Sequence, residues 1–158
     1  MKVRVKVVES VEAETQDVQR RVAQRAAEVF LERAGAPGTA MEDWLRAERE
    51  IVWRPSMEVV RTAEAFVVEA AVAGVNPRRL DVHVSSTELL VRSELQHSDA
   101  AKGGDVVLCE FVNGPLFRTF RFPATIDPDR VSAECVNGML RITAPIAKVG
   151  PRLAALVA

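Results

Sequence analysis

The chain has 158 residues, of which 48% are hydrophobic and 27% are charged. This length and composition can bury a core in one ordinary domain plus a small extra piece, and they exclude two large domains and disorder throughout. The 21 basic and 22 acidic residues give a net charge of −1. Without an overall positive field, binding to nucleic acid or to an anionic membrane is not expected.

Cysteine content and the apolar pattern favour a cytoplasmic location. Two cysteines, Cys109 and Cys135, are too few for the disulfide framework of a small secreted domain, so we expect reduced thiols. The first residues alternate valine with charge and do not resemble an export signal. No segment approaches the roughly 20 consecutive apolar residues that span a bilayer, so no membrane partner is expected.

Residues 15–54 are expected to form a helical hairpin after an N-terminal arm of residues 1–14. Apolar residues recur there every three or four positions, which is the period of an amphipathic helix. Thr15 or Asp17 is a candidate cap for the first helix, and Gly35 permits a left-handed stop at its end.

The second helix of the hairpin is expected to begin at Thr39. Thr39 and Glu42 have the spacing of a capping box, in which each side chain accepts a hydrogen bond from the backbone of the other residue. Two short helices bury little area alone, so we expect Trp44 and Trp53 to seal the hairpin against a larger body rather than to stack on a ligand.

From residue 55 the apolar period changes from helical to strand-like. Short runs of Val, Phe, Ile and Leu are separated by turn residues about every ten positions, which predicts an antiparallel β-sandwich or barrel. The expected strands are residues 57–62, 66–72, 80–85, 88–93, 116–122, 131–136 and 139–144. Asn137 and Gly138 predict a two-residue hairpin turn, because both tolerate positive φ.

A long connection separates the strands that end near residue 95 and begin near residue 116. It starts polar and then becomes apolar at Val106, Val107 and Leu108. A strand-forming patch at the end of a long loop does not easily return to its own sheet, so it is a candidate for pairing with another subunit.

Motifs for catalysis and cofactor binding are not found. The glycines do not form a phosphate-binding loop. His83 and His97 lack the close spacing to cysteines that a metal site needs, and we interpret them as a solvent-facing strand residue and a loop residue. Cys135 is expected to be a buried thiol, whereas Cys109 borders the loop. The sequence therefore predicts neither an enzyme nor a bound cofactor.

Two motifs carry a resemblance to a known family: Ala133-x-x-x-Asn137-Gly138-x-Leu140 and, before it, Glu110-x-x-x-Gly114-x-x-x-Arg118-x-Phe120-Arg121-x-Pro123. Together they resemble the small heat-shock protein (α-crystallin) family of ATP-independent chaperones. The resemblance implies a mainly β fold, an immunoglobulin-like antiparallel β-sandwich of the α-crystallin type, over residues 55–146, with a C-terminal tail at 147–158. The hairpin resembles a short bacterial module of unknown function through Asp43-Trp44-x-x-Ala47-Glu48-x-Glu50, which favours a bacterial source.

The resemblance also implies a function and its sites. A holdase would bind partly unfolded proteins and prevent their aggregation, through a groove lined by Leu80, Val82, Val84, Val131, Ala133 and Cys135. Val106, Val107 and Leu108 would cross to a partner subunit in a homodimer or larger homo-oligomer, and Arg118 would pair with an acidic residue at that interface.

The C-terminal tail departs from the family pattern. Family members typically end in an Ile-x-Ile or Ile-x-Val plug that docks on a neighbour, whereas this tail offers only Leu153-Ala-Ala-Leu156-Val157, so assembly into a large shell is not favoured. A protein-interaction adaptor, in which the sandwich and the hairpin recruit one specific partner, is the alternative function.

Overall fold

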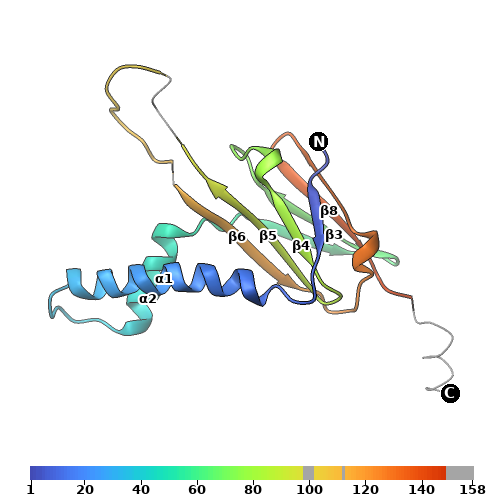
Figure 1. The fold of residues 1–158 in the computed structure, drawn as a ribbon, viewed down its shortest axis with the longest axis horizontal. Coiled ribbons are helices and arrows are strands. Elements are labelled where there is room, and N and C mark those ends of the chain that lie inside the picture. The colour runs from blue at the N-terminus through green and yellow to red at the C-terminus, as the bar shows by residue number, and fades with distance from the viewer. Residues whose placement is uncertain (98–101, 112, 149–158) are drawn as a thin grey trace.

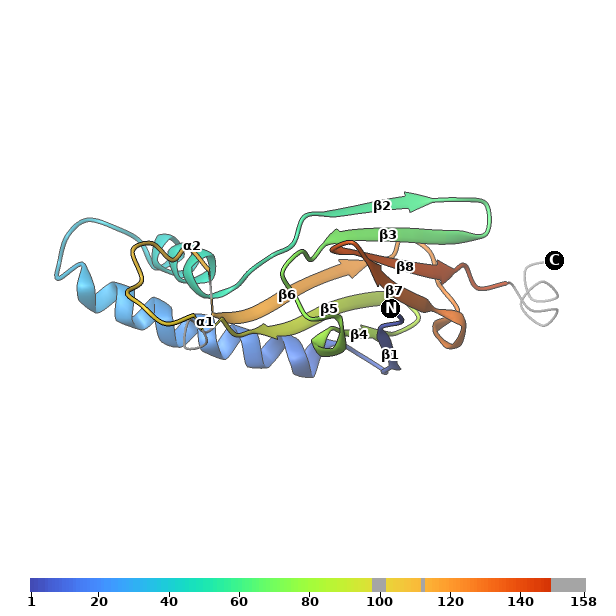
Figure 2. The same cartoon turned by 90° about the horizontal axis from the view of Figure 1, so that it is seen from above.

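Two four-stranded sheets face each other; α1 (Glu12–Glu32) runs along the outer side of one of them, and α2 (Ala40–Ile51) lies beside α1 near the start of β6 (Gly114–Arg121) (Figures 1 and 2). The computed structural model describes residues 1–97, 102–111 and 113–148. The strands are β1 (Arg4–Val7), β2 (Met57–Arg61), β3 (Ala65–Ala71), β4 (Asp81–Val84), β5 (Glu88–Leu95), β6 (Gly114–Arg121), β7 (Ser132–Val136) and β8 (Met139–Pro145), and the helices are α1 (Glu12–Glu32) and α2 (Ala40–Ile51). One sheet has the strand order β1-β4-β5-β6 and the other β2-β3-β8-β7.

The sandwich core follows from the alternation of the strands. In β3 the side chains of Phe66, Val68 and Ala70 are buried while their neighbours are half-buried, which is the period of two of a strand with one face on the core. Leu140 and Ile142 of the adjacent β8 meet them in the same apolar cluster. The predicted antiparallel β-sandwich is confirmed, and every strand expected from residue 55 onward is present.

The hairpin turn between β7 and β8 forms as its two residues predict. Asn137 and Gly138 have φ of 52° and 77°, which is the left-handed backbone that a type I′ turn requires at both central positions. This turn sets the register in which Val136 lies opposite Met139.

Strand β1 was not expected from the sequence. The segment interpreted as an N-terminal arm contains these four residues, which pair in parallel with β4 so that Val5 lies opposite Val82. The other neighbouring strands of the described sheets are antiparallel. As a result, β4 is an inner strand of its sheet and not an edge.

The two helices pack on each other as the expected hairpin. The capping box at Thr39 is confirmed, because its hydroxyl accepts from the Glu42 amide at 3.2 Å and the Glu42 carboxylate accepts from the Thr39 amide at 2.8 Å. The expected cap of α1 is wrong. The helix begins earlier, with Val11 at the cap position and no side-chain cap, and the Thr15 hydroxyl donates to the Val11 carbonyl oxygen at 2.9 Å.

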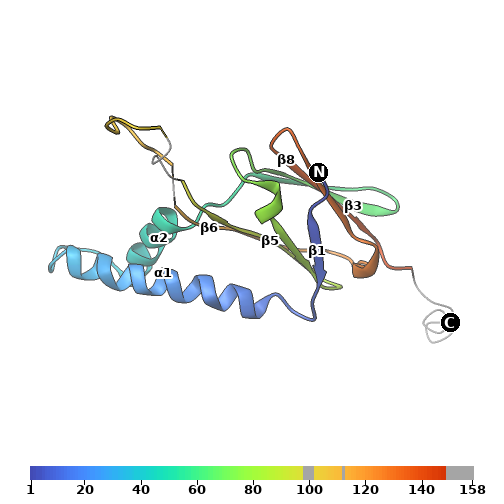
Figure 3. The same ribbon diagram turned by 45° about the horizontal axis from the view of Figure 1, so that its top comes forward.

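An apolar cluster joins the hairpin to the outer face of the β5–β6 pair (Figure 3). Leu90 and Phe117 from the sheet meet Val22 of α1 and Ala47 of α2, and the half-buried Trp44 packs against them. The hairpin is therefore docked on the sandwich.

Backbone contacts also hold the end of α2 to the start of β6. The Trp53 amide donates to the Pro115 carbonyl oxygen at 2.9 Å, and the Phe117 amide donates to the Trp53 carbonyl oxygen at 3.0 Å. Gly114 has a φ of 148°, and a Cβ there would lie 2.7 Å from the Ile51 carbonyl oxygen. A glycine is required because the two backbones approach so closely.

Within the described residues, none of the helices has the length and apolar character needed to cross a membrane.

Candidate functional site

The six groove residues named from the sequence come together between β4 and β7, at the open side of the sandwich. Five of them are buried, and Val131 is half-buried against the same core cluster. Leu80 directly precedes β4, which carries Val82 and Val84 in one sheet, whereas Ala133 and Cys135 belong to β7 of the other. The resemblance implies a groove between these two strands, and their inward-facing side chains share the apolar core cluster.

The first residues of the chain lie in this groove and bond to both of its sides. Along β7, the Met1 nitrogen donates to the Cys135 carbonyl oxygen at 2.9 Å, and the Cys135 amide donates back at 2.8 Å. The Val3 amide then donates to the Ala133 carbonyl oxygen at 2.9 Å, after which the chain continues as β1 along β4. Val3 is buried in the core cluster and Val5 packs against it.

An opening remains beside β1, where it separates from β7. This cavity of about 500 Å³ is bordered by residues in or next to β1, β7 and β8, namely Lys2, Val3, Val5, Val131, Ser132, Ala133, Glu134, Arg141 and Thr143. A cavity therefore remains on the β7 side of β1.

The loop residues expected at a subunit contact are exposed. Val106, Val107 and Leu108 have 57, 98 and 77% of their surface accessible, and Phe111 of the same loop has 66%. Residues 102–111 extend away from the sandwich in Figure 1. Such a contiguous apolar surface is characteristic of an interaction site.

Arg118 lies on β6, on the face of that strand that also carries Leu116 and Phe120. Its Nε atom is buried and has no hydrogen-bond partner among the described residues. A buried guanidinium nitrogen that bonds to nothing is costly, and a native structure usually provides a partner for it.

One outer edge of the sandwich is open within the described residues. Strand β2 has β3 on one side and no strand on the other. Val60 of β2 is 47% exposed. An unpaired edge with an exposed apolar side chain can accept a strand from another chain.

The expectation for His83 is wrong. The imidazole is 7% exposed, because α1 covers the outer face of β4, and its Nδ1 lies 3.2 Å from a carboxylate oxygen of Glu14. Cys135 is buried, as expected, and Cys109 is exposed. Among the described residues, no group of three or more His, Cys, Asp or Glu is placed to hold a metal ion.

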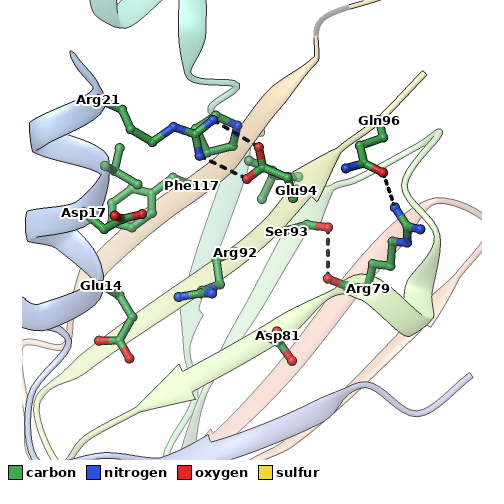
Figure 4. A pocket seen from close by; sticks show the side chains of 13 residues that line it. Glu14, Asp17, Arg21, Arg79, Asp81, Arg92, Ser93, Glu94, Gln96 and Phe117 are labelled. Atoms are coloured by element: carbon green, nitrogen blue, oxygen red, sulfur yellow. Dashed lines mark hydrogen bonds and ion pairs between the residues drawn. The ribbon is translucent and has the colours of Figure 1, made fainter. Parts of the chain in front are cut away.

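A second cavity, of about 450 Å³, lies between α1 and the sheet and is lined by charged side chains of both signs (Figure 4). Arg21 donates two hydrogen bonds to the Glu94 carboxylate, each 3.1 Å long. Arg79 donates to Gln96 at 3.2 Å. One ion pair, Arg21 with Glu94, closes across this cavity, which is a polar seam between the helix and the sheet.

A network of ion pairs links α1 to α2. Arg25 bonds to Glu28, Glu32 and Glu50 at 2.7–2.9 Å. Hydrogen bonds from Arg25 and then Arg46 hold the pKa of the Glu50 carboxyl below its usual value. A less exposed pair, Arg33 with Asp43, bridges the two helices at 3.0 Å. These contacts stabilise the hairpin and form no reactive site.

Comparison with known sequence families assigns the chain to a family. The pattern of the Hsp20/alpha crystallin family matches residues 58–153. The chain belongs to this family. Residues 17–52, which form most of the hairpin, match a family described as a protein of unknown function (DUF2934).

Relatives in this family support the assignment. The 18 kDa antigen 2 of Mycobacterium avium is 34% identical over 97 residues, which are 61% of this chain and 69% of that protein. Heat shock protein 16.0 from Schizosaccharomyces pombe superposes with a TM-score of 0.55 at 27% identity, covering 62% of this chain and 94% of the other. A small heat-shock protein from Xylella fastidiosa gives 0.54 at 25% identity, covering 63% and 93%.

Sequence reasoning missed the occupant of the groove. The alternation of valine with basic residues at positions 2–7 is itself a strand pattern, and it was interpreted only as evidence against an export signal. That alternation could have revealed β1 as a strand, although not the sheet edge to which it adds.

Proposed function

We propose that the protein is an ATP-independent holdase of the small heat-shock type, which binds partly unfolded proteins and prevents their aggregation. The observation that carries this proposal is that β4 and β7, the two strands to which the resemblance assigns the client groove, both bond to an extended segment of the chain. Membership of the family supports the same function.

The groove suits many client sequences for a physical reason. A strand that adds to a sheet edge is held mainly by backbone hydrogen bonds, which every sequence can make. Its alternate side chains enter an apolar channel such as that of Val82, Val84 and Ala133. Binding of this kind selects for exposed apolar, extended chain, which is what an unfolding protein presents.

We propose that the active unit is a homodimer or a larger homo-oligomer. The loop that carries Val106, Val107 and Leu108 would reach a second copy and pair with the open edge of its β2. This contact would cover the exposed apolar side chains of the loop. The buried Nε of Arg118 would then bond to an acidic side chain of the partner. We further propose a cytoplasmic protein that catalyses no reaction and holds no cofactor.

The holdase function is tested by light scattering. The purified chain is mixed, without ATP, with several unrelated proteins that aggregate on heating. Suppression of scattering for most of them is the expected result. A chain that suppresses none would contradict the holdase, and one stable partner captured instead would favour the adaptor, whose hairpin exposes Phe30, Leu31, Met41 and Leu45.

The interface role of Arg118 is tested by solution mass. Arg118→Ala is expected to shift the protein from dimer toward monomer, whereas Arg121→Ala, an exposed arginine on the same strand, is the matched control. If both variants keep the wild-type mass at the same concentration, Arg118 does not hold the interface.

A further inference from the structure

Residues 1–8, which we name the plug segment, occupy the groove that the proposed function assigns to clients. The Val3 side chain is buried between the two sheets and Val5 packs beside it, so the apolar face of the segment packs on the core. Val5 and Val7 lie opposite Val82 and Val84 of β4. The backbone edge of β4 is therefore already paired, and a strand edge accepts one partner at a time.

The charges of the plug segment are opposite to those of the residues on either side of it. Arg4 approaches Asp81 to 3.9 Å, and Lys2 lies opposite Glu134 on β7. The basic side chains face solvent while the valines at positions 3 and 5 face inward. The apolar face thus meets the channel and the basic face meets acidic residues on both of its sides.

The strand that holds the plug segment to β4 is short. The strand β1 has four residue pairs with β4, and the side chains of its ion pair are 78% and 36% exposed, so that pair adds little. Short strands with solvent on one face belong to the least stable part of a fold.

The chain that follows the plug segment is anchored. Val11 is 5% exposed and packs in the cluster that docks the hairpin on Leu90 and Phe117. The plug segment can therefore leave the groove while α1 stays in place, and it returns at the high effective concentration of a tethered ligand.

We propose that the plug segment is an autoinhibitory strand, which closes the groove between β4 and β7 and must leave before a strand from another polypeptide can enter. That the competing strand belongs to a client protein rests on the proposed function, whereas the competition for the groove does not. An external strand binds in proportion to the fraction of molecules whose groove is open.

A fluorescently labelled peptide of residues 1–8 is the probe for an open groove. In Val3→Asp/Val5→Asp the plug segment carries two charges that the apolar channel rejects, so the peptide is expected to bind about tenfold or more tightly than to wild type. Arg4→Gln/Lys6→Gln changes the solvent-facing side of β1 and is the matched control, with binding expected to remain near wild type.

A crosslinked variant tests the same competition without weakening the fold. Lys2 and Glu134 are directly opposite in an antiparallel bridge, and the Cα separation of such pairs permits a disulfide. Lys2→Cys/Glu134→Cys, in a background with Cys109→Ser and Cys135→Ala, is expected to bind no peptide when oxidised and to regain binding when reduced. Equal binding by the oxidised and reduced forms would overturn the proposal.

Alkylation of Cys135 reports the position of the plug segment in the otherwise native chain. Its backbone is paired with Met1 and it is 6% exposed, whereas the exposed Cys109 serves as the internal reference. Val3→Asp/Val5→Asp is expected to raise the iodoacetamide rate of Cys135 about tenfold relative to Cys109. An unchanged ratio would refute a plug that covers this residue.

Aggregation assays of the same proteins separate the two proposals. If the oxidised crosslinked variant suppresses aggregation less than its reduced form, both proposals are supported. If peptide binding follows the prediction and neither form suppresses aggregation, the autoinhibitory strand stands and the holdase function fails.

Discussion

Replacing Gly114 with alanine should loosen the junction between the hairpin and the sandwich. The backbone at this position has a φ of 148°, and a Cβ would meet the Ile51 carbonyl oxygen at 2.7 Å. A residue other than glycine in such a conformation costs about 1–3 kcal/mol. The atom it strikes belongs to the backbone, so the end of α2 must move as well, and we expect a total loss of about 3 kcal/mol.

The assay for Gly114→Ala is urea unfolding followed by tryptophan fluorescence. Trp44 and Trp53 are the two tryptophans of the chain, and both lie in the hairpin or its junction. With a denaturant slope of about 2 kcal/mol per molar, the midpoint should fall by about 1.5 M.

Gly35→Ala is the matched control for that measurement. Gly35 has a φ of 84°, and a Cβ at this position would have no atom within 4 Å, so the substitution has the conformational cost alone, about 1 kcal/mol. A midpoint for Gly114→Ala no lower than that of Gly35→Ala would refute the close approach of Ile51 as the cause.

Three further predictions concern the hairpin, each measured by the same urea assay. Phe117→Ala removes a ring packed under the hairpin and should cost about 3 kcal/mol; an unchanged midpoint would contradict docking of the hairpin on the sheet. Asp43→Ala leaves the Arg33 guanidinium without its buried partner and should cost about 2 kcal/mol, whereas a neutral effect would show that the pair adds nothing. Glu50 has a lowered pKa, so its ionised form stabilises the fold above its ordinary pKa and this contribution is lost as the pH falls through the folded value. Glu50→Gln should therefore unfold before wild type at pH 7 and together with it in acid, and an equal difference at both pH values would contradict this assignment.

Local patterns account for most of the β-sandwich. Alternating apolar residues predicted each strand from residue 57 onward, and Asn137 with Gly138 predicted the turn of the last hairpin, because both signals depend on neighbours in the chain. The capping box at Thr39 was predictable for the same reason. The start of α1 was not, because the cap position is held by an apolar residue, Val11, and not by Thr15 or Asp17, the polar residues expected to cap the helix.

The sequence by itself determined the strands from residue 57 onward, the helical hairpin and the apolar alternation along those strands, since each of these depends on the spacing of nearby side chains. Only the tertiary structure decided that residues 1–7 lie between β4 and β7 and that α1 buries His83. Both features join parts of the chain about 70 or more positions apart, and such pairings depend on which surfaces remain uncovered once the sheets have packed.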